Sequence, residues 1–121
     1  SVVADTINTA TGIQSTNNAL LGCAKAWVQW AGATGTIASS YNVSSITRSG
    51  TGTFIINFAT ALADNKYTVA GSCGSGGNVG GYMISNYVSA PTTSACYVST
   101  YSTVPALTDY TYTSAMIFGN G

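Results

Sequence analysis

Short segments rich in Val, Ile, Thr, Tyr, Phe and Trp follow one another along most of the chain, and Gly, Ser, Asn or Pro separates them. Runs of this length and composition, bounded by turn-forming residues, are typical of β-strands. Roughly one run occurs every dozen residues, and this spacing predicts an all-β fold, an antiparallel β-sandwich or a barrel-like domain. The predicted strands are 24–30, 36–41, 43–47, 53–58, 67–71, 82–88, 95–101 and 110–118.

Apolar residues occupy both faces of these predicted strands. Because side chains alternate along a strand, Phe54, Ile56 and Phe58 would share one face, with Ile55 and Asn57 on the other. The first strand divides in the same way, with Ala24, Ala26, Val28 and Trp30 opposite Lys25, Trp27 and Gln29. One face fills the core, so the second apolar face predicts another sheet or another subunit that covers it.

The first 22 residues have a different pattern, with isolated apolar positions in a background of Thr, Asn and Ala. Ile7, Ile13 and Leu20 are spaced by six and seven residues, which fits a coiled coil poorly. We interpret 1–22 as an extended N-terminal lead-in that winds against partner chains, with a short helix over 15–21 capped by Ser15. A frayed extended arm is the alternative. The remaining residues, 23–121, form one β-domain.

Charge is the scarcest property of the chain: 5% of residues are charged, with three Lys+Arg, three Asp+Glu, no His and a formal net charge of zero. About a quarter would be usual. Catalytic triads and metal sites that need histidine are excluded, so we expect no metal and no cofactor. Nucleic acid is an unsuitable partner, because phosphates require clustered Lys and Arg. A neutral domain tends to associate with itself.

The hydrophobic share of 45% excludes intrinsic disorder. No apolar run approaches the roughly 18 residues that a transmembrane helix needs, so we expect no membrane insertion. The N-terminal stretch also lacks the basic flank and apolar core of a secretory signal, and we expect a soluble chain.

Asp64 and Asp109 are the candidate carboxylates for a catalytic pair. A glycosidase built on Asp64 and Asp109 would need the two carboxyl groups about 5–10 Å apart. Asp64 lies in the turn-forming string 63–66, and Asp109 follows Pro105 in a predicted loop. The tendency of aspartate to hydrogen-bond to nearby backbone in turns explains the presence of both residues. We therefore predict that the chain is not an enzyme and has no catalytic residues.

The three cysteines, Cys23, Cys73 and Cys96, are odd in number and widely spaced, which fits neither a disulfide framework nor a metal site. Cys73 and Cys96 could form the single intrachain bridge if the strands that carry them are neighbours. The alternative, which we favour, is three reduced and mostly buried thiols.

The second half of the chain holds the candidate binding residues. The glycine-rich string 71–81 lacks the Lys-Ser/Thr ending of a phosphate-binding loop, so we interpret it as a flexible loop that displays a variable surface. Tyrosine combined with Ser, Gly and Asn is typical of recognition surfaces, although a single Tyr is more often ordinary strand filling. The predicted receptor-binding residues are Tyr82, Tyr87, Tyr97, Tyr101, Tyr110, Tyr112 and Asn78.

An ordered series of motifs covers about residues 23–71. It comprises A-K-A-W-V-Q-W at 24–30, Y-N-V-S-S-I-T at 41–47, G-T-G-T-F-I-I-N-F at 50–58 and A-D-N-K-Y-T-V at 63–69. The series resembles the C-terminal β-rich domain of phage tail fibre and related virion fibre proteins. The closing segment 115–119 is similar to the chain end of that family, whereas residues 72–114 match none of its motifs.

The resemblance implies an intertwined homotrimer without enzymatic activity, located on the virion after synthesis in the host cytoplasm. Its distal part would adhere to a host surface receptor, a glycan or a protein, and residues 1–22 would join other virion proteins. The alternative is a capsid decoration, cement or head-fibre protein. With three copies, most of the uncharged surface would be buried against two other chains, and the six charges would lie mainly at turns or on the rim.

Overall fold

The structure is a computed structural model that describes residues 6–9, 12–15 and 22–119. All elements in this part of the chain are β-strands, as the sequence pattern predicted. They are β1 (Thr6–Thr9), β2 (Gly12–Ser15), β3 (Ala26–Ala31), β4 (Thr36–Tyr41), β5 (Val43–Gly50), β6 (Thr53–Phe58), β7 (Thr68–Gly76), β8 (Val79–Ser85), β9 (Ala95–Ser102) and β10 (Tyr112–Phe118).

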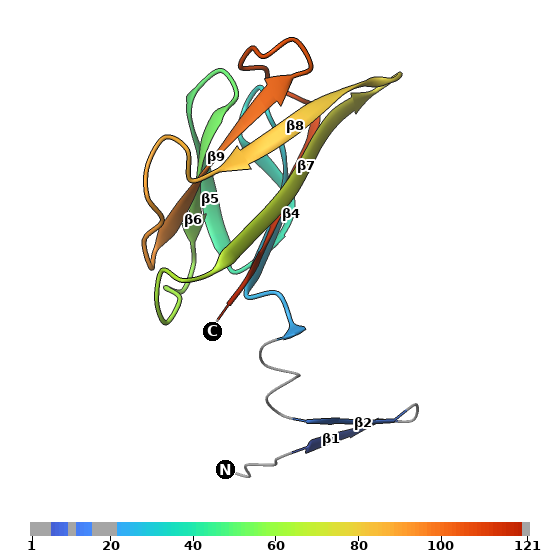
Figure 1. Cartoon of the computed structure of the whole chain (residues 1–121), viewed down its shortest axis with the longest axis vertical. Helices are drawn as coiled ribbons and strands as arrows, with labels where there is room; N and C mark the ends of the chain where they lie inside the picture. Colours follow the sequence, from blue (N-terminus) through green and yellow to red (C-terminus); the bar gives the residue numbers. More distant parts are fainter. Residues whose placement is uncertain (1–5, 10–11, 16–21, 120–121) are drawn as a thin grey trace.

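Eight of these strands form one sheet that curls into a nearly closed barrel (Figure 1). The order is β4-β3-β10-β7-β8-β9-β6-β5, and every neighbouring pair is antiparallel. Of the two predicted architectures, the barrel-like one is therefore present. The edge strands β4 and β5 follow each other along the chain, and Asn42 alone joins them. Its backbone φ of 55° makes the sharp change of direction.

The glycine-rich string 71–81 is not a flexible loop, and this prediction was wrong. Strand β7 continues to Gly76 and β8 begins at Val79, so that the string forms a hairpin. The two turn residues, Gly77 and Asn78, have φ values of 60° and 62°. Positive φ at both positions is the geometry of a tight hairpin turn, which glycine and asparagine adopt readily. Glycine weakens a strand but does not prevent the extended conformation.

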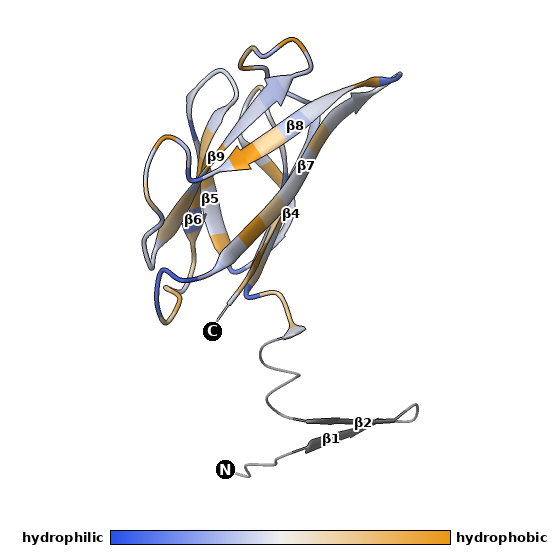
Figure 2. Ribbon diagram, in the orientation of Figure 1, coloured by the Kyte–Doolittle hydropathy of each residue, from blue (hydrophilic) through white to orange (hydrophobic). Residues whose placement is uncertain are grey.

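The core fills the inside of the barrel, and the predicted alternation is confirmed. In β3, Ala26, Val28 and Trp30 are buried while Trp27 and Gln29 are exposed. In β6, the predicted inward residues are buried: Phe54, Ile56 and Phe58. Trp30 and Phe54 pack edge to face at the centre, with ring centroids 5.3 Å apart. Figure 2 shows the strongly hydrophilic residues mainly in loops and turns, outside this apolar interior.

The described part of the lead-in is an antiparallel hairpin, in which Thr6 pairs with Ser15. Ser15 is the last residue of β2, so it lies in a strand and not in the predicted helix. Its predicted capping role depends on the residues that follow it. The rest of the predicted helix, 16–21, lies outside the described residues. Winding of 1–22 against partner chains stays a prediction.

Charged residues avoid the barrel wall. Seven of its eight strands contain none, and the exception is Arg48 on the edge strand β5. The other charges of the described barrel lie in connections or beside strand ends: Lys25, Asp64, Lys66 and Asp109. The predicted placement at turns or on the rim is thus confirmed for these residues, and Asp5 lies outside the described residues.

Candidate functional site

The predicted tyrosines do not gather on one face. Tyr82 and Tyr101 are register partners on β8 and β9, and their rings stack with centroids 5.7 Å apart and planes inclined by 14°. Tyr97 lies four residues before Tyr101 and so on the same face of β9, whereas the other candidates lie elsewhere: Tyr112 on β10, Tyr87 in the loop 86–94 and Asn78 in the β7–β8 turn. The stacked pair is the only place at which two of the predicted residues are brought into ring contact in the described chain.

Tyr110 is a correction to the predicted set, because it is only 2% exposed and cannot contact a receptor. Its hydroxyl lies 2.5 Å from the position that a Cβ at Gly81 would occupy. The sequence pattern placed Tyr110 at the start of a strand over 110–118. Strand β10 instead begins at Tyr112, so the alternation does not extend back to Tyr110. Its side chain therefore turns inward.

An apolar row crosses the outside of the barrel on β4, β3, β10 and β7. Cross-strand register places Tyr41 beside Trp27, Trp27 beside Met116, and Met116 beside Ala70. Tyr41, Trp27 and Met116 are 56%, 40% and 47% exposed. This is the second apolar face that the sequence predicted through Trp27. No described segment of the chain covers it, and its coverage by another subunit stays a prediction.

A polar row runs beside the apolar one. Register partners here are Ser39, Gln29, Ser114 and Ser72, on the same four strands. The hydroxyl oxygens of Ser72 and Ser114 lie 3.2 Å apart and share a hydrogen bond. The exposed carboxamide of Gln29 forms no hydrogen bond with other residues in the described part of the chain. Its donors and acceptor are therefore free for a ligand.

The two rows enclose a shallow depression of about 330 Å³ over β10. We call it the β10 hollow and define it by its outward-facing residues: Trp27, Gln29, Ala70, Ser72, Ser114 and Met116. Sequence reasoning missed it, because its residues come from three segments that only the sheet register brings together. The exposed position of Trp27 beside Gln29 was the one available signal.

The β10 hollow offers uncharged groups for binding. None of its lining residues is charged or titrates near neutral pH. An indole and a thioether supply apolar contact at one side, and two hydroxyls and a carboxamide supply hydrogen bonds at the other. Such a combination suits an uncharged ligand that has both apolar and hydroxyl-bearing surfaces.

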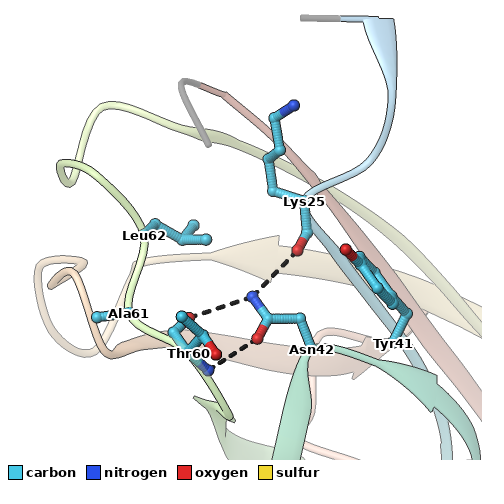
Figure 3. Close-up of a pocket in the computed structure, with 6 residues that line it drawn as sticks. All are labelled: Lys25, Tyr41, Asn42, Thr60, Ala61 and Leu62. Carbon is cyan, nitrogen blue, oxygen red and sulfur yellow. Dashed lines mark hydrogen bonds between the residues drawn. The ribbon is translucent and has the colours of Figure 1, made fainter. Parts of the chain in front are cut away.

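A second depression, of about 380 Å³, lies at one end of the barrel (Figure 3). Its central side chain, Asn42, donates hydrogen bonds to the carbonyls of Lys25 and Thr60, at 3.1 and 3.2 Å. Asn42 also accepts one from the Thr60 backbone N–H at 2.8 Å. Because these bonds tie the start of β3 to the segment after β6, Asn42 has a structural role. A ligand would have to break them to use its amide.

Asp64 and Asp109 do not form a carboxylate pair, since their loops lie at opposite ends of the barrel (Figure 1). Asp64 accepts a hydrogen bond from the Lys66 backbone N–H at 2.8 Å, the turn role that was predicted. Asp109 has another role: it pairs with Arg48 at 2.6 Å and accepts from the Gly52 N–H at 2.8 Å. The hydrogen bond to Asp109 raises the pKa of Arg48. Both carboxylates thus hold loops in place.

The cysteines form no disulfide bond. Cys73 on β7 and Cys96 on β9 are separated by β8, so the condition for a bridge is not met. Cys96 is buried, Cys73 is half-buried and Cys23 is exposed, so the thiols are less buried than expected. Burial raises the pKa of Cys96 to about 12 and also raises that of Cys73. Both thiols therefore stay protonated and unreactive near neutral pH.

Taken together, fold and surface define an all-β domain, a nearly closed eight-stranded antiparallel barrel whose strands carry a single charged residue, Arg48. No protein-family model matches the chain, and no curated protein or solved structure matches it either. Within the described residues, no helix is long and apolar enough to cross a membrane. The same residues contain no group of three or more His, Cys, Asp or Glu that could hold a metal ion.

Proposed function

We propose that the chain is a phage virion structural protein, a tail fibre or receptor-binding domain that adheres as a homotrimer to a host surface glycan. The observation that carries the proposal is the outer wall of the barrel, in which Arg48 is the single charged strand residue and from which Trp27, Tyr82 and Met116 project with 40–47% of their surface exposed. The order of motifs over residues 23–71, which resembles virion fibre domains, supports the same function.

Receptor binding is supported by the kind of residues that the wall presents. Aromatic rings offer contact area at a small cost in conformational entropy, and serine, glycine and asparagine add hydrogen bonds. The stacked pair Tyr82 and Tyr101 lies on one side of the barrel, and the β10 hollow lies on another. Their lack of charge fits adhesion to a glycan better than adhesion to phosphate groups or to a basic protein.

Self-association is supported by the two edges of the sheet. In the described sheet, β4 pairs only with β3 and β5 pairs only with β6. Natural edge strands are commonly protected by charged residues, yet β4 has none along its six residues. An exposed uncharged edge favours contact with another chain, and cyclic symmetry is the usual form of such an assembly. The trimer and its contact to other virion proteins through 1–22 belong to the proposal.

Two measurements on the purified chain test this function. Sedimentation equilibrium should give the mass of a trimer, three times 12.3 kDa. Fluorescently labelled protein should bind host cells, and pretreatment of the cells with periodate, which destroys glycans, should abolish binding. A monomer that binds neither untreated cells nor purified cell-surface glycan would contradict the proposal.

A capsid decoration or head-fibre protein is the second candidate. The observation that favours it is the β1–β2 hairpin, which forms a sheet separate from the barrel and would suit an attachment arm. An electron cryomicroscopy map of the particle distinguishes the two locations. Density for this fold at the end of a tail appendage supports the first candidate, whereas density on the capsomers supports the second.

A further inference from the structure

We infer that the β10 hollow is a carbohydrate-binding subsite that holds one neutral hexose unit of a glycan. The inference rests on the proposed function and deepens it, because it assigns the glycan contact to β3, β10 and β7. Of the tyrosines predicted from the sequence, only Tyr112 is near: it precedes Ser114 on the outer side of β10, where it is exposed.

The shape of the hollow follows from the order of side chains along β10. Small Ser114 lies between the larger Tyr112 and Met116 on the outward face, which produces a dip in the wall. The neighbouring strand β7 contributes only small outward residues at the same level, Ala70 and Ser72. A ring-sized ligand can therefore approach the backbone of the sheet closely. The same face would be flat if these positions carried branched side chains.

Trp27 forms the apolar side of the hollow. Its register partners Tyr41 and Met116 lie on either side of it, and the side chain keeps 40% of its surface exposed. The face of an indole ring is electron-rich and attracts the weakly positive C–H groups on the flat face of a sugar. Contact with a hexose would remove apolar surface that the folded barrel leaves in water.

Gln29, Ser72 and Ser114 form the polar side of the hollow. The Gln29 carboxamide has two donors and one acceptor oxygen, none of them used by other described residues. The two serine hydroxyls share a single hydrogen bond of 3.2 Å, which leaves further donor and acceptor capacity. Vicinal sugar hydroxyls, each both donor and acceptor, match this set.

The absence of charge selects a neutral sugar. No lysine or arginine lines the hollow, so the carboxylate of a uronic or sialic acid would lose hydration there without gaining a partner. The hydroxyl and carboxamide groups on the polar side of the hollow also argue against a purely apolar occupant, which would leave these groups without hydrogen bonds. A second copy of the chain is therefore the weaker candidate for this site, and the experiment below distinguishes it.

The chain carries its own internal control for a binding experiment, because it contains two tryptophans on opposite sides of the wall. In ¹⁵N-labelled full-length protein, the two indole N–H signals are to be followed during titration with uncharged hexasaccharides of glucose, mannose or galactose. We expect the Trp27 signal to shift in a saturable manner with at least one of them. The signal of buried Trp30 should stay in place, and a polygalacturonic acid hexamer should shift neither.

Variants test the assignment. We expect two variants, Trp27→Ala and Gln29→Met, each to weaken saccharide binding about tenfold or more. The Gln29→Met variant keeps the length of the side chain but removes its hydrogen bonds. Trp27→Phe should retain part of the affinity. Leu107→Ala is the control, since it removes a similarly exposed apolar side chain from the loop after β9, and it should leave the affinity unchanged. Tyr82→Ala tests the alternative location of the subsite on β8 and β9.

Several results would overturn the inference. Saccharide binding that is lost in Tyr82→Ala but kept in Trp27→Ala would move the subsite to β8 and β9 and leave the proposed function intact. Preference for the acidic hexamer would refute the neutral ligand. Absence of saccharide binding, together with loss of the trimer in Trp27→Ala, would identify a second copy as the occupant. By contrast, failure of the protein to bind host cells would refute the proposed function even if the purified saccharide shifted Trp27.

Discussion

Two tryptophans on β3 show how differently the inner and outer sides of the barrel wall are used. Trp30 is 1% exposed and packs edge to face against Phe54 in the core. Trp27, three residues earlier on the same strand, is 40% exposed and lies beside Met116 and Gln29 on the outside. The same side chain thus serves folding on one side of the wall and is free for recognition on the other.

The polar groups of the two sides differ in the same way. Inside, Thr100 and Thr113 are fully buried, and their hydroxyls donate to the carbonyls of Thr108 and Tyr110 at 2.6 and 3.0 Å. Outside, the carboxamide of Gln29 has no partner among the described residues. Both threonine hydroxyls are thus paired in the interior, although the buried Trp30 Nε1 has no partner among the described residues. The outer wall retains an exposed carboxamide that a ligand can use.

Removal of the inner ring should have the largest effect on stability. Trp30→Ala deletes a buried aromatic side chain and leaves a cavity against Phe54, so we expect a loss of about 3–5 kcal/mol in the free energy of unfolding. Urea denaturation followed by circular dichroism measures it. A loss below about 1 kcal/mol would show that the barrel interior is much less tightly packed than the structure indicates.

Alkaline pH should reveal the buried thiol of the interior. Burial raises the pKa of Cys96 from 9.0 to about 12, so the folded chain keeps the thiol protonated after the unfolded chain has ionised it. The contribution of the protonated Cys96 thiol to the free energy of unfolding is fully present below about pH 9. As the pH rises from there toward 12, the free energy of unfolding falls by about 1.4 kcal/mol per pH unit.

The measurement is urea denaturation of the chain and of Cys96→Ala across this pH range, in which the variant should show the shallower decline. Cys23→Ala is the control, because Cys23 is exposed, and it should decline as the unmodified chain does. Burial also raises the pKa of Tyr67, so some alkaline loss should remain in every variant. Equal slopes for Cys96→Ala and the unmodified chain would contradict the assignment.

The barrel wall has no room for an added methyl group at Gly71. A Cβ there would collide with the Met83 sulfur on one side and come within 2.6 Å of the Ser114 carbonyl oxygen. We expect Gly71→Ala to cost about 1–3 kcal/mol in thermal or urea denaturation. Gly50→Ala is the matched control on β5, where a Cβ would meet no atom within 4 Å, and it should change stability by less than about 0.5 kcal/mol. Equal effects of the two variants would contradict the packing described at Gly71.

Removal of the outer ring should have the smallest effect on the fold. Trp27→Ala should lower the free energy of unfolding of the separated subunit by about 1 kcal/mol or less, because the side chain lies outside the core and makes cross-strand contacts with Tyr41 and Met116. Denaturation at protein concentrations low enough to dissociate an assembly measures this value. A cost close to that of Trp30→Ala would remove the distinction between the two sides of the wall.

The strands were the most predictable part of this protein, because their signals are local. Alternation in β6, for example, placed Phe54, Ile56 and Phe58 inside without knowledge of any other strand. Local sequence signals gave wrong predictions where the result depended on the residue at which a strand begins or ends. Tyr110 was assigned to a strand that begins two residues later, and the glycine-rich string was taken for a loop although its backbone pairs with itself.

The candidate site was less predictable, because it depends on register between distant segments. The sequence by itself determined an uncharged all-β chain with apolar residues on both strand faces, since composition and period-two alternation are properties of consecutive residues. Only the tertiary structure decided that Trp27 and Gln29 lie beside Ser114 and Ser72, because strand order and register are set by packing of the whole sheet. That long-range pairing forms the hollow.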